Sequence, residues 1–326
     1  MSNQLRDQAP NLDEIVAKLE VEGFRFSRLK LEVEDPCRPI DVEWNYKDMV
    51  HVGHIHSHMS RQFMYIGKSA YTSFDLQKIL GITIPQSASF YVTHDNRIIV
   101  NTVLFLYVII VEIRYEAIGD LQTRTSTSYA IGARSSLLRL FMPILHKVIE
   151  RNWRQFTKDD RPLRARRGQL RKSGYEFCDV SPIDHRETLR VTGKGVDTPA
   201  ARPGYRCELR LGGTAAATQY IGADDHLGLQ VHIDEDTVRL FPRLCPHRGA
   251  LLDAKTIQAG PGGGLIECPW HGRKFRALAS ISRDGGVQRF EGSFHRCTQD
   301  NGVLTIETKE TPQTPDADWT EVWSKI

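Results

Sequence analysis

Hydrophobic and polar positions follow two different periods along the first half of the chain. From Ser87 onward, β-branched and aromatic residues crowd into segments such as SASFYVT, RIIVNTVLFLYVIIVEIRYEAIG and TRTSTSYAIG, which are typical of antiparallel strands. Ahead of them, Leu12 to Leu19 has the pattern of a short helix with its N-terminal cap near Asn11. These patterns predict an α+β module.

A long helix is predicted after the strands. Its apolar residues recur at three- and four-residue steps and therefore share one side: Leu137, Phe141, Ile144, Leu145, Val148, Ile149, Trp153 and Phe156. Such a stripe favours a helix laid across a sheet. Pro162 is expected to end or kink this helix, because proline disfavours α geometry at the preceding residue and donates no backbone hydrogen bond.

A basic segment, PLRARRGQLRKSG, is expected to start a second helix at Pro162. With Arg161 it contributes six cations: Arg161, Arg164, Arg166, Arg167, Arg171 and Lys172. They indicate either a solvated helix face or a docking surface for an acidic electron-transfer partner. Nucleic acid is not favoured, because no aromatic residues interleave with these charges.

The domain organisation follows from a change in composition. Residues 181–201 are polar and contain Gly and Pro without a sustained apolar period, so they are predicted to link two domains. We expect residues 1–180 to form an α+β domain with an antiparallel sheet and a long C-terminal helix. Residues 202–310 are expected to form an all-β domain, and residues 311–326 a tail.

Overall composition is ordinary for a globular protein, with 43 basic and 40 acidic side chains among 326 residues. The longest apolar run, Thr102 to Val111, is about half of what a bilayer span needs. The first thirty residues alternate charged with hydrophobic residues, unlike a secretion signal. We therefore expect a soluble, cytoplasmic protein without a membrane span.

Two loops each combine one cysteine with one histidine. LCPHRGALL contains Cys245 and His247, and ECPWHGRKF contains Cys268 and His271. Two thiolates and two imidazoles can hold either a structural zinc or a [2Fe-2S] cluster. Zinc sites commonly place two cysteines together in one loop. A [2Fe-2S] cluster with two cysteines on one iron and two histidines on the other matches loops that each supply one cysteine and one histidine. The pattern thus favours the cluster.

The other four cysteines lack a cysteine or histidine partner at metal spacing within their own loops. We predict that they are not ligands: Cys37, Cys178, Cys207 and Cys297.

A second histidine cluster lies in the N-terminal half, where HVGHIHSH places four of the twelve histidines within eight residues. In a helix His51, His54 and His58 would share a face, whereas in a strand His54, His56 and His58 would do so. Neither regular structure aligns His51 with His56. The residues alone leave open whether the cluster holds a metal or is ordinary surface or core histidine.

CPHRGALL and CPWHGRKF resemble the two cluster-binding loops of the Rieske family, and the likeness extends from roughly Arg202 to Glu310. DMVHVGHIH resembles the mononuclear-iron motif of Rieske non-haem iron oxygenases. That resemblance implies a [2Fe-2S] cluster in the C-terminal domain and Fe(II) held by His51, His56 and a carboxylate. Asp48 would be the bridging carboxylate between the two metal centres, and His54 or His58 would replace His56 if the local structure is regular.

The third iron ligand is expected from the long helix. Asp160 continues its apolar stripe and would face inward, whereas Asp159 points about 100° away. Alternatively, either aspartate caps a following helix that starts at Pro162. Glu150 is a reserve candidate.

The resemblance implies an oxygenase with a START-like helix-grip domain that hydroxylates or dealkylates a hydrophobic substrate. Electrons from NAD(P)H would come through a separate reductase or ferredoxin, because the chain has no Gly-rich dinucleotide motif. A homo-oligomer, most simply a trimer, would bring clusters and irons of neighbouring subunits together. The order of the two domains is the reverse of the usual one in that family. The alternative function is a ligand-binding helix-grip domain without iron, fused to a Rieske electron carrier.

Overall fold

The computed structural model describes two units, one of residues 1–168 with 180–185 and one of residues 169–179 with 186–326. The described residues are 10–48, 51–56, 59–66, 70–79, 82–93, 95–172, 175–177, 189–191, 206–210, 217–221, 229–234, 237–245, 249–258, 264–277, 279–282, 288–291 and 295–308. Among these residues, no helix is both long enough and apolar enough to cross a membrane.

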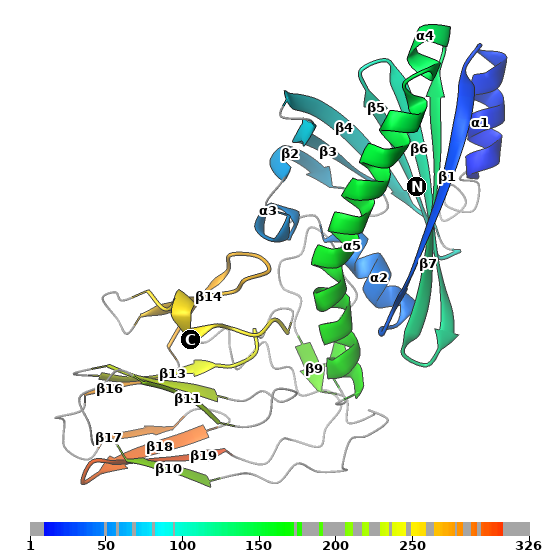
Figure 1. Ribbon diagram of the computed structural model, residues 1–326. Helices are drawn as coiled ribbons and strands as arrows, with labels where there is room; N and C mark the ends of the chain where they lie inside the picture. Colours follow the sequence, from blue (N-terminus) through cyan, green and yellow to red (C-terminus); the bar gives the residue numbers. More distant parts are fainter. Residues whose placement is uncertain are drawn as a thin grey trace. The chain divides into compact units, whose positions relative to one another are not determined.

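The first unit is a seven-stranded antiparallel sheet with helices packed against it (Figure 1). Its strand order is β1-β7-β6-β5-β4-β3-β2. The strands are β1 (Arg25–Asp35), β2 (Met59–Ile66), β3 (Ala70–Ile79), β4 (Ile82–Val92), β5 (Arg97–Leu104), β6 (Tyr107–Gly119) and β7 (Gln122–Ala133). The helices are α1 (Leu12–Val21), α2 (Pro39–Lys47), α3 (Val52–Ile55), α4 (Ser136–Arg139) and α5 (Met142–Lys172).

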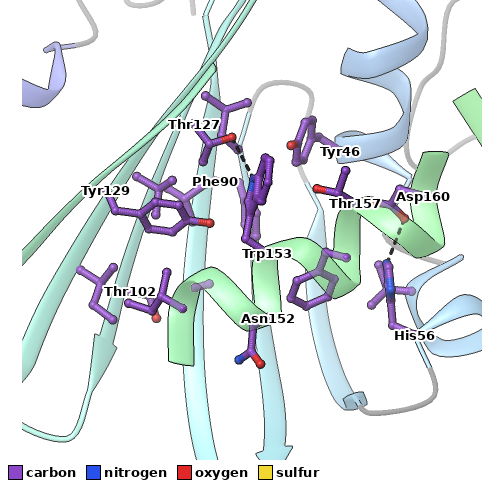
Figure 2. Close-up of a pocket in the computed structure, with 18 of the residues that line it drawn as sticks. Tyr46, His56, Phe90, Thr102, Thr127, Tyr129, Asn152, Trp153, Thr157 and Asp160 are labelled. Carbon is purple, nitrogen blue, oxygen red and sulfur yellow. Dashed lines mark hydrogen bonds and ion pairs between the residues drawn. The ribbon is translucent and has the colours of Figure 1, made fainter. Parts of the chain in front are cut away.

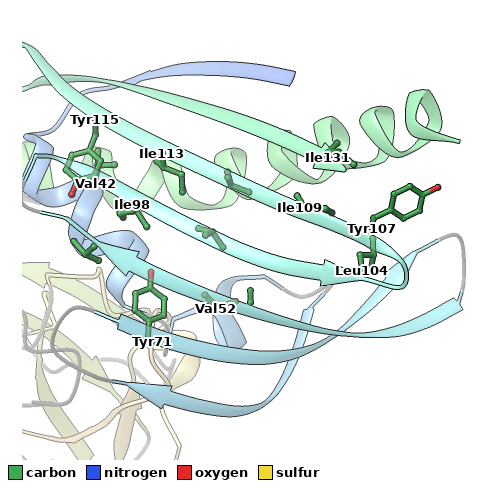
Figure 3. Packing of buried hydrophobic residues seen from close by; sticks show 14 of the residues in the cluster. Val42, Val52, Tyr71, Ile98, Leu104, Tyr107, Ile109, Ile113, Tyr115 and Ile131 are labelled. Carbon is green, nitrogen blue, oxygen red and sulfur yellow. The ribbon is translucent and has the colours of Figure 1, made fainter. Parts of the chain in front are cut away.

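The two faces of the sheet are covered by different helices. Along β6 the odd-numbered apolar residues, such as Ile109 and Ile113, belong to the core that α5 covers, and Figure 3 shows part of this cluster. Ile110 points the other way and packs with Leu12 and Val16 of α1. This alternation is the two-residue period of a strand buried on both sides.

The predicted N-terminal helix is confirmed as α1, which is two residues longer than expected. Asn11 and Glu14 form a reciprocal capping box at its start: the Asn11 side chain accepts from the Glu14 backbone, and the Glu14 side chain accepts from that of Asn11. Strands β1, β2 and β3 were not predicted. β1 alternates apolar and charged residues at the edge of the sheet, where only β7 pairs with it.

The prediction that Pro162 ends the helix and starts a second one is wrong, because α5 runs as one helix from Met142 to Lys172. A kink at Pro162, the other expected outcome, stays a prediction. Proline removes the hydrogen bond to the carbonyl four residues earlier, here that of Lys158. Both residues are exposed, so water can hydrogen-bond to that carbonyl. The stripe therefore continues without a break as far as Leu163 and Leu170, both buried.

The second unit consists of strands, with one short 3₁₀ turn, η2 (Ala254–Thr256), among its described residues. Two four-stranded antiparallel sheets, β10-β19-β18-β17 and β11-β12-β13-β16, share one core that includes Val231, Leu240, Cys297 and Ile306. Their strands are β10 (Arg206–Arg210), β11 (Ala217–Ile221), β12 (Leu229–Ile233), β13 (Thr237–Pro242), β16 (Ala279–Ser282), β17 (Gln288–Glu291), β18 (His295–Asp300) and β19 (Val303–Thr308). Two short pairs, β14 (Leu265–Glu267) with β15 (Lys274–Arg276) and β8 (Tyr175–Phe177) with β9 (Leu189–Val191), complete the described part.

Gly168 allows α5 to approach the segment between β1 and α2. A Cβ atom at this position would lie 1.8 Å from the backbone oxygen of Pro36. We expect Gly168→Ala to lower the free energy of unfolding by about 1–3 kcal/mol, because the backbone would have to move to make room for the added methyl group. Denaturant unfolding would measure the loss. Lys158→Ala, on an exposed turn of the same helix, should change stability by within about 0.5 kcal/mol, and an equal loss in both variants would contradict the interpretation.

Candidate functional sites

His51 and His56 are brought together by a single turn of helix. His51 is the residue before α3 and His56 is the residue after it, where the backbone has left the helical region at φ −93° and ψ 83°. Because the helical turn ends there, the five-residue step places both rings in one site, 5.7 Å apart between centroids. His54 is exposed on the intervening turn, and His58 lies outside the described residues.

Asp160 reaches the same site from α5, as Figure 2 shows for its contact with His56. Its Oδ1 atom lies 3.0 Å from His56 Nε2 and 3.3 Å from His51 Nε2. One ligand atom from each of the three side chains lies within 4.8 Å of the others, and all three residues are buried. Two imidazole nitrogens and one carboxylate oxygen form the donor set of a facial triad, which suits ferrous iron.

The second nitrogen of each ring is held by an oxygen of the chain. His51 Nδ1 hydrogen-bonds to the backbone carbonyl of Asp48, and His56 Nδ1 lies 3.2 Å from Asp159 Oδ2. Both acceptors favour a proton on Nδ1. A cation bound at the site would replace the Nε2 proton that hydrogen-bonds to Asp160 and would take the Nε2 lone pair. Gln155 donates to the other oxygen of Asp159 at 2.7 Å and so orients this carboxylate.

The charged groups of the site are buried and stabilise one another by hydrogen bonds and charge interactions. Burial alone would raise the pKa of Asp160, but hydrogen bonds from His51 and His56 hold that pKa below its ordinary value. Burial likewise opposes the charged form of His56, and hydrogen bonding to Asp160 and Asp159 outweighs it and raises the pKa of the ring. The carboxylate is therefore ionised at neutral pH and available to a cation.

Arg164, one helical turn beyond Asp160, is buried behind the site. It donates from Nε to Asn45 Oδ1 at 2.9 Å and from a terminal nitrogen to Asp35 Oδ2 at 2.7 Å. Its other terminal nitrogen lies 3.5 Å from Asp160 Oδ2. The two oxygens of Asp160 thus have different neighbours: Oδ1 faces the histidines and Oδ2 faces the guanidinium.

Arg167 is a second buried cation on the same helix. It donates to Asp41 at 2.8 Å and its guanidinium lies 4.0 Å from the centre of the Trp44 ring. Arg171 is buried as well. The prediction that this basic run forms a solvated or docking face is therefore wrong for Arg164, Arg167 and Arg171, because acidic and aromatic residues of α2 and its surroundings cover the first two. Arg161 and Lys172 are exposed.

A cavity of about 230 Å³ leads away from the triad between the sheet and α5. The surface of its lining is mostly apolar, although polar side chains such as Tyr129, Asn152 and Thr157 also line it. Trp153 Nε1 donates to Thr127 Oγ1 at 3.3 Å, and Gln86 Nε2 donates to Thr102 Oγ1 at 3.0 Å. The main apolar lining residues are Ala88, Phe90, Val100, Leu104, Ile109, Val111, Ile113, Leu145, Val148, Ile149 and Phe156.

The reserve candidate Glu150 does not join the triad, since it pairs with Arg154 at 2.7 Å on the surface of α5. Sequence reasoning also missed Asn45 and Arg164. Asn45 Nδ2 lies 3.5 Å from His51 Nε2. A signal for Arg164 existed in its position, four residues after Asp160 and therefore on the same helix face.

The two cysteine loops of the second unit have the same backbone hydrogen bonds. The N–H of Cys245 donates to the carbonyl of Ala250 and that of Cys268 to Arg273, at 2.7 and 2.8 Å. In each loop the glycine four residues later donates back to the cysteine carbonyl, from Gly249 at 2.8 Å and from Gly272 at 2.9 Å. Both glycines have positive φ, 77° and 65°, which a side chain would disfavour.

The two thiols meet between these loops. A hydrogen bond with Cys245, and a further one with His271, hold the pKa of Cys268 below its ordinary value despite its burial. His247 lies outside the described residues. By contrast, burial raises the pKa of Cys37 and of Cys297 to about 12, as expected for thiols of a hydrophobic core. Cys178 and the side chain of Cys207 lie outside the described part.

Comparison with known proteins adds one family. The model of the Rieske [2Fe-2S] domain matches residues 204–291, a segment that contains both cysteine loops. Residues 204–291 are a Rieske [2Fe-2S] domain. This assignment implies a [2Fe-2S] cluster, an electron-transfer function and an electron-transfer partner. The thiol pair, His271 and the matched turns fit such a cluster.

Three similar solved structures each cover less than half of this chain. One is the Zhui aromatase/cyclase from a Streptomyces species, with 11% identity over 44% of this chain and 96% of that one, at a TM-score of 0.39. A START superfamily protein from Mycobacterium smegmatis has 10% identity over 42% and 96% of the two chains, with a TM-score of 0.35. Norcoclaurine synthase from Thalictrum flavum has 10% identity over 42% and 83%, with a TM-score of 0.32. No curated protein matches the sequence.

The predicted fold class is confirmed. The first unit has the antiparallel sheet and long helix expected of a helix-grip domain, and the second contains the all-β Rieske domain.

Replacement of a loop cysteine should separate ligands from core thiols. We expect Cys268→Ser to lose the visible absorbance of the cluster and Cys297→Ala to retain it, because Cys268 contacts a second thiol and a histidine whereas Cys297 belongs to the hydrophobic core. Anaerobic absorbance spectra and acid-labile sulfide would measure this, with circular dichroism to verify folding. Bleaching of folded Cys297→Ala would contradict the assignment.

Proposed function

We propose that this protein is a Rieske-type mononuclear non-haem iron oxygenase acting on a hydrophobic organic substrate. The observation that carries the proposal is the buried triad of His51, His56 and Asp160 at one end of an apolar cavity, in a chain that also contains a Rieske domain. Electrons would come from NAD(P)H through a separate reductase or ferredoxin.

Each part of the first unit has a task in this reaction. His51, His56 and Asp160 would hold ferrous iron, which activates dioxygen for hydroxylation or dealkylation. The Asp48 carbonyl and Asp159 fix the two rings so that Nε2 faces the metal. The apolar lining binds the substrate and excludes water, while Thr127, Thr102 and their partners offer a few polar contacts that orient it.

The proposal predicts about three irons and two inorganic sulfides per chain, against two irons for a plain ligand-binding domain fused to a Rieske electron carrier. His56→Ala should remove one iron and leave the two sulfides and the cluster spectrum unchanged. Glu150→Gln is the matched control on α5, because this carboxylate lies at the surface with Arg154. Metal analysis after anaerobic reconstitution gives the count, and two irons in the wild-type protein would favour the electron carrier.

Arg164 is expected to keep Asp160 turned with Oδ1 toward the histidines. Arg164→Lys retains the charge but cannot bind Asn45, Asp35 and Asp160 together, so we expect the affinity for Fe(II) or Co(II) to fall by about 10- to 100-fold. Titration calorimetry of the divalent ion would measure it. Arg167→Lys is the control, since Arg167 is equally buried on the same helix but binds Asp41. An equal fall in both variants would mean that the loss is only structural.

Asp48 is the proposed bridge to a Rieske histidine of the neighbouring subunit in a ring, most simply a trimer. It is buried at the end of α2, and its backbone carbonyl hydrogen-bonds with His51 Nδ1. Asp48→Asn keeps that carbonyl contact and should leave both metal sites loaded. Product formation and single-turnover transfer from the reduced cluster should fall by orders of magnitude, and transfer at the wild-type rate would refute the bridge.

A further inference from the structure

Six large apolar side chains, each more than half exposed, lie in two segments of the first unit. One segment is the two-residue turn between β5 and β6, and the other runs from α4 into the first turn of α5. We call this set the apolar tip: Phe105, Leu106, Leu137, Leu140, Phe141 and Ile144. Groups of exposed apolar residues on this scale mark surfaces that contact something other than water.

The two segments meet at the same end of the sheet. Tyr107, the first residue of β6, donates from its hydroxyl to the backbone carbonyl of Leu138 in α4 at 2.8 Å. Figure 1 shows α4 beside that end of the sheet, and Figure 3 shows Leu104 and Tyr107 on either side of the hairpin turn. The apolar tip therefore combines a hairpin turn with a helix start.

The backbone at Phe105 is a second, independent observation. Phe105 has φ +54°, in the left-handed region that bulky residues avoid. The other two described non-glycine residues with positive φ are Asn96 and Asn301, the residue type that tolerates this conformation. Two-residue hairpins prefer Asn-Gly or similar pairs here. The pair Phe105-Leu106 is thus unfavourable for folding in two ways: Phe105 has a positive φ, and both apolar side chains are exposed to water. The stability of the fold therefore does not explain why these residues are present.

The charge around the apolar tip is positive. Residues 121–149 contain no acidic side chain but include Arg134, Arg139 and Lys147, and residues 96–111 contain none either. Glu20 lies in the last turn of α1 and Glu22 caps the end of that helix, whose core lies on the other face of the sheet. Gly23, the next residue, lies beside Arg134, so Arg139 and Lys147 are the basic residues of the helical segment itself. Protruding apolar side chains with basic neighbours are the combination that binds the interface of an anionic bilayer.

The cavity extends to the base of the apolar tip. Leu104 and Leu145, which line it, are the chain neighbours of Phe105 and Ile144. The triad lies farther along α5, where Asp160 comes sixteen residues after Ile144, a helical rise of about 24 Å.

We propose that the apolar tip docks on the surface of an anionic lipid bilayer. A hydrophobic compound dissolved in the bilayer would then meet the end of the protein where the cavity begins. The inference depends on the exposed residues, the Phe105 backbone and the apolar cavity, and it holds whether or not the triad binds iron.

Flotation of the full-length protein with vesicles tests the proposal. We expect binding to vesicles of phosphatidylcholine and phosphatidylglycerol at a ratio of about 7:3, weaker binding to phosphatidylcholine alone, and weakening by salt. Phe105→Asn should reduce the vesicle-bound fraction at least about tenfold while raising the melting temperature, because asparagine tolerates positive φ. Ile118→Asn is the matched control, since Ile118 is exposed at the opposite end of β6. This variant should bind vesicles as the wild-type protein does.

A second variant, Leu140→Glu, changes the helical segment of the apolar tip and should also abolish vesicle binding. Analytical ultracentrifugation in the absence of lipid tests the alternative that the apolar tip joins two copies of the protein. If the wild-type protein does not bind vesicles and these variants instead dissociate an oligomer, the apolar tip is an interface between copies and the proposal is overturned. Unchanged vesicle binding by both variants would overturn it as well.

Discussion

The buried guanidinium of Arg164 is the interaction on which the arrangement of the first unit depends. It is almost fully buried and bonds at once to Asp35 at the end of β1, to Asn45 in α2 and to Asp160 on its own helix. Removing one member of such a buried charge pair typically costs about 3–5 kcal/mol, because the partner is left uncompensated. The same contacts that tie α5 to the sheet therefore also set the orientation of a candidate metal ligand.

This coupling explains why α5 must be long and unbroken. Residues 145–156 cover the cavity, Asp160 reaches the histidines, and Arg164 and Arg167 anchor the helix to residues that precede and form α2. A break at Pro162 would separate Asp160 from Arg164. The exposed position of the proline lets the helix continue, and Gly168 allows the helix to pack closely against the backbone of Pro36.

Local spacing predicted much of this protein, and long-range pairing accounts for what it missed. The cysteine and histidine loops and the stripe that ends at Asp160 could be read directly, because ligand spacing and helix period are local properties. The choice of His56 over His54 needed the end of α3. Arg164 and Arg167 looked like solvated charges, since their partners Asp35 and Asp41 lie 129 and 126 residues away in sequence. The turn at Phe105 was hidden inside an apolar run without turn residues.

The two ends of the helix-grip unit therefore differ in the physical constraint that each satisfies. Around Asp160 the two histidines and the Arg164 guanidinium are buried, and each is oriented by another polar group, so the site tolerates little movement and can hold an ion in one geometry. Around Phe105 the chain accepts an unfavourable φ and exposes apolar side chains to water. A site that must position charge needs rigid partners, whereas a surface that must meet a fluid, apolar phase needs only protruding side chains. The cavity between them connects these two environments within one core, and its apolar lining is compatible with both.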